Sequence, residues 1–232
     1  MATSSAPIAG LVLAAGAGSR YGMPKALAQG DDGIPWLVRT IRTLTDAGCS
    51  PVIVVLGAET AEVRALLHQF GMTPSVVLTQ AEDWAEGLSA SLRAGLRQAT
   101  ELQATELLPA PVAVAIVPVD IPGLLPGTVA RLIGTLPIDT LPGDTLPGDT
   151  VPGATVPGAT DADANPVGPL TLRQAGFDAR PGHPVVIGRA HWGALIDTAT
   201  GDTGARPYLQ SHNTRLVDCA DLETGLDVDT RD

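Results

Sequence analysis

Short apolar runs alternate along the chain with segments in which apolar residues recur every three or four positions. The apolar runs lie at residues 8–13, 51–56, 75–78 and 112–117. Their length and aliphatic composition are typical of buried strands. The helical spacing covers residues 36–47, 61–70 and 86–99. Strands that alternate with helices in this way form repeated βαβ units, so we predict a single three-layer α/β domain with a mainly parallel sheet.

A repeat rich in proline, glycine and threonine interrupts this alternation, after a helix expected at residues 126–136. Between Leu136 and Thr160 the chain reads LPIDT, LPGDT, LPGDT, VPGAT and VPGAT. Such a segment lacks the apolar stripe that a helix or packed sheet needs. We therefore expect a low-complexity insertion at about residues 136–165, within a domain spanning 1–232, and we expect it to tolerate deletion. A calcium-binding β-roll is the alternative, but its repeats are longer and richer in Gly and Asp.

Composition and charge narrow the class of protein. A chain of 232 residues with 44% hydrophobic residues can bury a substantial core. The net charge of −11 and the 3% aromatic content argue against a nucleic-acid partner, which needs clustered cations and stacking platforms. The two cysteines imply no disulfide framework, and the sequence has neither signal-peptide features nor a run of membrane-spanning length. We expect a cytoplasmic protein with no nucleic-acid or membrane partner.

The first apolar run leads directly into a glycine-rich loop. Residues 11–25 read LVLAAGAGSRYGMPK. Small residues let consecutive backbone N–H groups turn toward an anion, and Arg20 and Lys25 add full positive charges. This combination predicts a phosphate-binding loop.

Two better-known glycine loops do not match this segment. The P-loop requires Gly-Lys-Ser/Thr, whereas Lys25 follows Pro24 here. The dinucleotide fingerprint requires Gly-x-Gly-x-x-Gly, whereas Gly16, Gly18 and Gly22 are spaced Gly-x-Gly-x-x-x-Gly. The loop therefore belongs to a third kind.

An aspartate follows the fourth apolar run, in the segment Pro118-Val119-Asp120-Ile121-Pro122. An acid at the carboxyl end of a parallel strand points into the crevice where open sheets bind ligands. Carboxylate oxygens are the donors that Mg²⁺ prefers, so Asp120 is a candidate metal ligand. A turn-capping role before Pro122 is the alternative.

The glycine loop resembles the signature of the MobA-like nucleotidyltransferase superfamily, Leu-Ala-Ala-Gly-x-Gly/Ser-x-Arg-x-Gly-x-Pro-Lys. Its Ala-Ala-Gly and Pro-Lys are most similar to the molybdenum cofactor cytidylyltransferase branch. The resemblance implies a Rossmann-like nucleotidyltransferase sheet, Mg²⁺ as cofactor, and transfer of CMP from CTP to molybdenum-molybdopterin phosphate with release of pyrophosphate. It also implies a molybdoenzyme as a client protein.

The same resemblance assigns roles to the loop. Arg20 would hold the departing β- and γ-phosphates, and Lys25 would stabilise the α-phosphoryl transition state. The expected nucleotide-binding residues are Leu13, Ala14, Ala15, Gly16, Gly18, Gly22 and Ser89.

Three later segments carry the remaining expectations. Residues 83–92 are similar to the family segment Trp-x-x-Gly-x-x-x-Ser-Leu that contains Ser89, although Ala81 stands where the family usually has Asn. Gly182-His183-Pro184, before a strand at 185–187, and Gly201 to Arg206, before a short helix, also match family patterns. They imply that His183, Asp202 and Arg206 bind the substrate. A surface hydroxyl for Ser89 and a structural role for His183 are the alternatives.

The C-terminal residues 225–230 resemble the family segment Asp-x-Asp-Thr-Pro, with Arg231 in place of the proline. We favour Asp229 over Asp227 as a second magnesium ligand, because Asp229 directly precedes the threonine. On a strand both carboxylates would lie on the same face, so the sequence does not separate them. Solvated terminal acids are the alternative.

Three other functions stay open at this point. A nucleotidyltransferase acting on a sugar phosphate or alcohol phosphate would keep the same loop and metal. An NAD(P)H-dependent oxidoreductase on the same fold would bind its dinucleotide through the glycine loop, with Glu59 placed like a ribose-binding acid. A nucleotide-binding chaperone without catalysis would deliver molybdenum cofactor to an apoenzyme.

Overall fold

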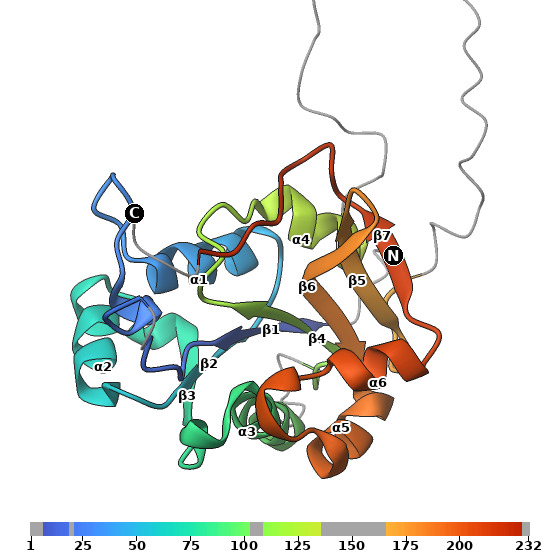
Figure 1. The fold of residues 1–232 in the computed structure, drawn as a ribbon, viewed down its shortest axis with the longest axis horizontal. Helices are drawn as coiled ribbons and strands as arrows, with labels where there is room; N and C mark the ends of the chain where they lie inside the picture. Colours follow the sequence, from blue (N-terminus) through green and yellow to red (C-terminus); the bar gives the residue numbers. More distant parts are fainter. Residues whose placement is uncertain (1–6, 19–20, 103–108, 136–165, 229–232) are drawn as a thin grey trace, which may run out of the picture.

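The computed structural model describes residues 7–18, 21–102, 109–135 and 166–228. These residues form one seven-stranded sheet in the order β3-β2-β1-β4-β6-β5-β7, with helices on both faces (Figure 1). The predicted α/β architecture with a mainly parallel sheet is confirmed. The pentapeptide repeat lies outside the described residues.

The first four strands are parallel. They are β1 (Ile8–Leu13), β2 (Val52–Leu56), β3 (Val76–Gln80) and β4 (Ala113–Pro118). β1, β2 and β4 are buried, and β3 is a partly exposed edge strand. β1 lies between β2 and β4 and is buried along its whole length. Parallel strands covered on both faces have nearly continuous apolar sequences, which is why β1, β2 and β4 were predictable.

The other half of the sheet mixes directions. It consists of β5 (Leu172–Phe177), β6 (Arg180–Gly188) and β7 (Arg215–Asp218). β6 is antiparallel to both β4 and β5, and β7 is parallel to β5. Asp178 and Ala179 turn the chain between β5 and β6 with φ values of 51° and 63°. Such hairpin turns usually carry Asn-Gly, and its absence here explains why the sequence analysis missed β5 and the start of β6.

Within the described residues, six α-helices pack on the two faces of the sheet. They are α1 (Trp36–Asp46), α2 (Thr60–Gln69), α3 (Leu88–Glu101), α4 (Pro126–Ile133), α5 (Trp192–Thr198) and α6 (Arg206–Ser211). α4 ends earlier than predicted because Gly134 adopts a left-handed conformation with φ of 75°. α3 begins later than predicted because Gly87, with φ of 114°, separates it from a short 3₁₀ helix at Trp84–Glu86. None of the helices in the described ranges has the length and hydrophobicity needed to cross a membrane.

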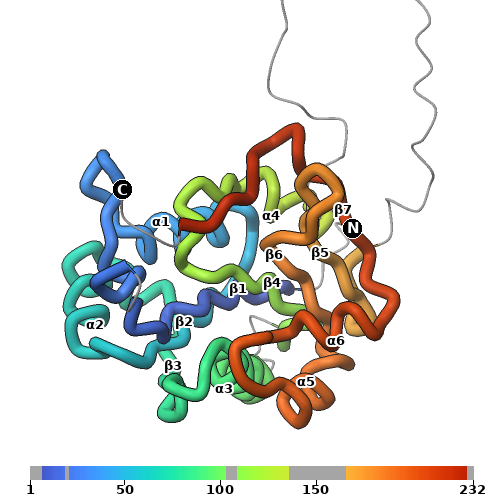
Figure 2. Tube along the Cα trace, in the orientation of Figure 1, coloured from blue at the N-terminus to red at the C-terminus, as the bar shows by residue number. Residues whose placement is uncertain are grey.

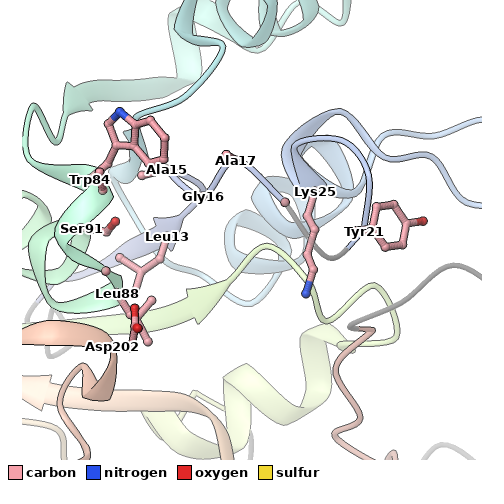
Figure 3. A pocket seen from close by; sticks show the side chains of 13 residues that line it. Leu13, Ala15, Gly16, Ala17, Tyr21, Lys25, Trp84, Leu88, Ser91 and Asp202 are labelled. Carbon is pink, nitrogen blue, oxygen red and sulfur yellow. The ribbon is translucent and has the colours of Figure 1, made fainter.

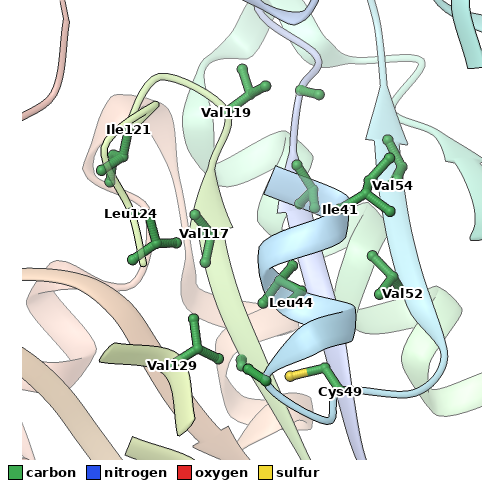
Figure 4. Close-up of a cluster of buried hydrophobic side chains, with 14 of the residues drawn as sticks. Ile41, Leu44, Cys49, Val52, Val54, Val117, Val119, Ile121, Leu124 and Val129 are labelled. Atoms are coloured by element: carbon green, nitrogen blue, oxygen red, sulfur yellow. The ribbon is translucent and has the colours of Figure 1, made fainter. Parts of the chain in front are cut away.

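Two apolar clusters form the core, one on each side of the sheet. α1, α2 and α4 contribute to one cluster, and α3, α5 and α6 to the other. In the first cluster, Ile41 and Leu44 of α1 lie against Val54 of β2 and Val117 of β4 (Figure 4). This packing fixes the carboxyl ends of β1, β2 and β4, from which the functional loops emerge.

Candidate active site

A cavity of about 540 Å³ opens at the carboxyl end of β1 (Figure 3). Its walls come from the glycine loop, from residues 84–91 and from the turn after α5. The lining residues are Leu13, Ala15, Gly16, Ala17, Gly18, Tyr21, Lys25, Trp84, Ala85, Gly87, Leu88, Ser91 and Asp202. This is the edge at which open parallel sheets bind ligands.

The glycine loop needs glycine at one position and leaves open space at another. Gly18 has φ of 64°, and a Cβ there would lie 1.8 Å from the carbonyl oxygen of Met23. The backbone N–H groups of Tyr21 and Gly22 both donate to the carbonyl oxygen of Gly18, at 2.9 and 2.8 Å. A Cβ at Gly16 would meet nothing within 4 Å. Gly18 therefore closes the loop, while Gly16 leaves its backbone accessible to a ligand.

Lys25 and Asp120, predicted from separate motifs, are in direct contact. Lys25 Nζ donates to Asp120 Oδ2 at 2.9 Å, and the two side chains are 16% and 23% exposed. The sheet register explains this contact, because Leu13 at the end of β1 pairs with Pro118 at the end of β4. The two loops leave the sheet side by side, so a cation and a hard oxygen ligand meet at the border of the cavity.

His183 lies on β6, close to the charged side chains of Asp120, Asp227 and Arg206. Burial lowers the pKa of its imidazole to about 4, although the nearby Asp120 and Asp227 act in the opposite direction. The guanidinium of Arg206 adds to the lowering of the pKa. The His183 ring is therefore neutral at pH 7, and the charges of Arg206 and Asp120 both lie close enough to act on it.

The segment after β7 passes across α4 and returns to the loop after β4 (Figure 2). The N–H of Val228 donates to the carbonyl oxygen of Asp120 at 2.9 Å. Gly225, with φ of 63°, lies against the ring of Phe177, where a Cβ would come within 2.2 Å of ring carbons. This contact guides Asp227 toward Asp120.

The structure therefore makes Asp227 a candidate metal ligand alongside Asp229. Residues 223–228 form neither helix nor strand, so the alternation expected of a strand does not apply to them. The structure places Asp227 close to the Asp120 loop, whereas Asp229, which the sequence favoured, lies outside the described residues, as does Arg20. The C-terminal motif was the signal for Asp227, but the motif alone did not separate the two acids.

Ser89 is not at the cavity surface, which corrects the expectation of direct nucleotide contact. Its side chain is fully buried, and its Oγ accepts a hydrogen bond from the N–H of Gly204 at 3.1 Å. The physical reason is the break at Gly87, which starts α3 at Leu88 and places Ser89 in its buried first turn. Ser91 lines the cavity instead.

Asp202, expected to bind the substrate, lines the cavity together with Gly87 and Leu88. The sequence analysis also missed Tyr21 and Leu88 as lining residues. Apolar spacing gave no reason to distinguish them from ordinary core residues.

The carboxylates fit a hard divalent cation better than zinc. Within the described ranges, no group of three or more His, Cys, Asp or Glu side chains is arranged to hold a metal ion. Asp120, with Asp227 nearby, offers oxygen donors next to the glycine loop. Mg²⁺ and similar cations are commonly held by one or two carboxylates, with substrate phosphates and water as the other ligands.

A mainly parallel sheet, a glycine loop after its first strand and an acid after its fourth define the Rossmann-like nucleotidyltransferase fold. The chain belongs to the family of the MobA-like NTP transferase domain, whose model matches residues 10–216. It is 32% identical over 231 residues to nicotine blue oxidoreductase of Paenarthrobacter nicotinovorans, covering 96% of this chain and 92% of that protein.

Solved structures share the fold. Rv0371c from Mycobacterium tuberculosis H37Rv superposes with a TM-score of 0.67 at 24% identity, covering 98% of this chain and 95% of that one. A structure of Rv0371c in complex with manganese gives a TM-score of 0.60 at 23% identity, covering 92% and 88%. A nucleotidyl transferase from Methanothermobacter thermautotroptrophicus gives 0.66 at 20% identity, covering 97% and 92%. The resemblance to the MobA-like superfamily is confirmed.

Proposed function

We propose that this protein is a cytoplasmic, magnesium-dependent nucleotidyltransferase that transfers CMP from CTP to molybdenum-molybdopterin phosphate and releases pyrophosphate. The observation that carries the proposal is the contact between Lys25 and Asp120 at the border of the cavity. It supports the proposal because a cation able to bind phosphate and a carboxylate able to bind a metal meet at one point. The choice of CTP and of the pterin rests on the Ala-Ala-Gly and Pro-Lys of the loop.

The transfer needs no nucleophilic side chain. An oxygen of the acceptor phosphate forms a bond to the α-phosphorus, and the bond from that phosphorus to the bridging oxygen of the β-phosphate breaks. Pyrophosphate leaves with the electron pair. The protein contributes by holding two anions in line and by stabilising the charge that develops, which is the usual division of labour in phosphoryl transfer.

The glycine loop binds the nucleotide. Backbone N–H groups around Gly16 donate to phosphate oxygens, Arg20 holds the β- and γ-phosphates, and Lys25 donates to the α-phosphoryl oxygens. Asp120, together with Asp227 or Asp229, would hold the divalent cation, which when bound neutralises charge on the phosphates.

Residues of β6 and α6 bind the acceptor phosphate. The guanidinium of Arg206 presents paired donors that match a phosphate. His183, neutral at pH 7, forms a hydrogen bond without adding charge. This division leaves the molybdenum-bearing pterin phosphate at the side of Asp120 that faces β6.

The test is pyrophosphate release, measured with Mg²⁺ or Mn²⁺ and each of the four nucleoside triphosphates, with and without molybdenum cofactor. We expect release that requires both CTP and the cofactor. Release with CTP and a sugar or alcohol phosphate instead would keep the transferase and replace the acceptor. No release with any combination would contradict the proposal.

An NAD(P)H-dependent oxidoreductase is the second candidate, and the name of the relative at 32% identity favours it. Two observations weigh against it. The glycine spacing differs from the dinucleotide fingerprint, and Glu59, the acid expected to bind ribose, is exposed and is not among the residues that line the cavity. Oxidation of NADH or NADPH by an added organic electron acceptor, without pyrophosphate release, would establish it.

A further inference from the structure

The cavity has a charged group on each of two opposite sides. Figure 3 shows Lys25 on one side of the loop residues Ala15 to Ala17, and Asp202 with Leu88 on the other. Among the described residues that line the cavity, Lys25 is the one cation and Asp202 the one carboxylate. The side that contains Asp202 is otherwise apolar or weakly polar.

Close packing, rather than an ion pair, fixes Asp202. The turn at Gly201–Thr203 lies on the start of α3, where Ser89 Oγ accepts from the N–H of Gly204. A Cβ on Gly87 would lie 2.2 Å from Asp202 Oδ1, so the carboxylate occupies the space that a side chain at Gly87 would fill. A Cβ on Gly204 would in turn lie 3.0 Å from Leu88.

A carboxylate in a cavity that binds a polyanion is unfavourable unless the ligand offers it hydrogen-bond donors. An ionised carboxylate can only accept hydrogen bonds. Within the described part of the chain, no hydrogen bond or ion pair engages the side chain of Asp202, which is exposed. Its acceptor oxygens are therefore directed at solvent or at a ligand in the cavity.

We propose that Asp202 recognises the nucleoside end of the substrate, by accepting hydrogen bonds from its uncharged donor groups. Two such donors belong to the same ligand: the hydroxyls of the ribose and the exocyclic amino group of the base. Trp84, half-buried on this side of the cavity, offers an aromatic face for the base. The inference rests on the proposed nucleotide-binding function and moves Asp202 from the acceptor substrate to the nucleotide.

Equilibrium binding of CTP, 2′-deoxy-CTP, 3′-deoxy-CTP and UTP tests the inference. Tryptophan fluorescence or calorimetry measures the dissociation constants. We expect wild-type protein to bind at least one analogue about ten- to hundredfold more weakly than CTP, the loss associated with a hydrogen bond to a charged group. Weak binding of a deoxy analogue identifies the ribose, and weak binding of UTP identifies the amino group. In Asp202→Ala this discrimination should disappear, and Asp202→Asn should keep part of it.

Inorganic tripolyphosphate provides the internal control, because it has no nucleoside. It should bind Asp202→Ala at least as tightly as wild type, since a like charge has been removed, which also shows that the variant is folded. Asp197→Ala, which removes an exposed carboxylate from α5, should behave as wild type. Unchanged discrimination in Asp202→Ala, or none in wild type, would overturn the inference while leaving pyrophosphate release intact. If wild type binds no nucleotide at all, the inference and the proposed function both fail.

Discussion

Lys25 is the only lysine in the chain, and all other cationic side chains apart from histidine are arginines. It lies where the register of β1 and β4 brings the glycine loop to Asp120. An ammonium is a compact charge with three donors, whereas a guanidinium is a planar fork. At the residue scale, the proposed chemistry therefore depends on one side chain that we expect an arginine to replace only in part.

We expect Lys25→Ala to lower turnover by about two to three orders of magnitude, the usual cost of losing one donor to the transition state. Steady-state pyrophosphate release measures this loss, and Lys25→Arg should restore only part of the rate. Because the chain has one lysine, amine-selective reductive methylation modifies only Lys25 and the terminal amine. CTP with Mg²⁺ should protect Lys25. Turnover near the wild-type value in Lys25→Ala would remove Lys25 from the mechanism.

The two C-terminal acids can be separated by parallel substitution. We expect Asp227→Asn to raise the Mg²⁺ concentration needed for half-maximal activity by about tenfold or more, because its backbone neighbour Val228 is bonded to Asp120. Asp229→Asn is the matched comparison, and metal titrations of both variants decide between them. A larger effect in Asp229→Asn would return the assignment to the residue that the sequence favoured.

Cys49 makes folding stability sensitive to alkaline pH. Burial raises the pKa of its thiol from 9.0 to about 12, so above pH 9 the unfolded chain loses this proton while the folded protein retains it. Stability is therefore lost between about pH 9 and pH 12, with a slope of at most about 1.4 kcal/mol per pH unit. Urea unfolding at pH 8, 9.5 and 10.5 should show a shallower decline for Cys49→Ala than for wild type. Parallel declines would contradict the assignment.

At the element scale, two segments far apart in sequence make the side of the cavity that contains Asp202, and Arg93 of α3 joins them. One guanidinium nitrogen donates to the carbonyl oxygen of Ala199 at 2.9 Å, and another donates to Asp83 and Glu86 at 2.6 and 2.8 Å. Arg93 keeps the pKa of the Asp83 carboxyl below its usual value. The segment containing Trp84 and the turn after α5 are thus held by one side chain.

Arg93→Met should raise the KM for the nucleotide about tenfold and change kcat much less, because it loosens a binding surface and not the reacting groups. The thermal midpoint should fall only slightly, since ion pairs near the surface contribute little to stability. Arg97→Met, one turn further along α3 and exposed, is the control and should leave KM unchanged. Equal effects of the two substitutions would show that Arg93 has no special positioning role.

At the scale of the whole molecule, the sheet combines a parallel half that holds the glycine loop with a mixed half that holds His183. The two halves meet where β4 and β6 run antiparallel. Asp120 follows β4 and His183 lies on β6, so in the proposed function the junction between the halves is also the junction between the nucleotide and acceptor sides. The C-terminal segment then crosses α4 to reach the same point.

The pentapeptide repeat should be dispensable for folding. Its sequence lacks the apolar residues that a packed core needs. A shorter connection also lowers the entropic cost of closing the loop, by about 1–2 kcal/mol of free energy. Replacing residues 136–165 by a short Gly-Ser linker should therefore leave the thermal midpoint unchanged or slightly raised, with pyrophosphate release preserved. A variant that is insoluble or melts well below wild type would show that the repeat contributes to the fold.

The sequence by itself determined the parallel half of the sheet and the two central charged residues. Strands buried on both faces must be apolar along their whole length, and Gly18 must be glycine where its loop closes on Met23. Both requirements are local, and so they are visible in the order of residues. Lys25 and Asp120 could be selected for the same reason, each from its own motif.

Only the tertiary structure decided which side chains meet. β7 pairs with β5, Ser89 is buried against Gly204 while Ser91 lines the cavity, and Asp202 lies in the cavity against Gly87. These contacts join residues that are far apart along the chain, and their geometry follows from strand register, helix starts and close packing. No periodicity within a single segment contains that information, because the partner belongs to another segment.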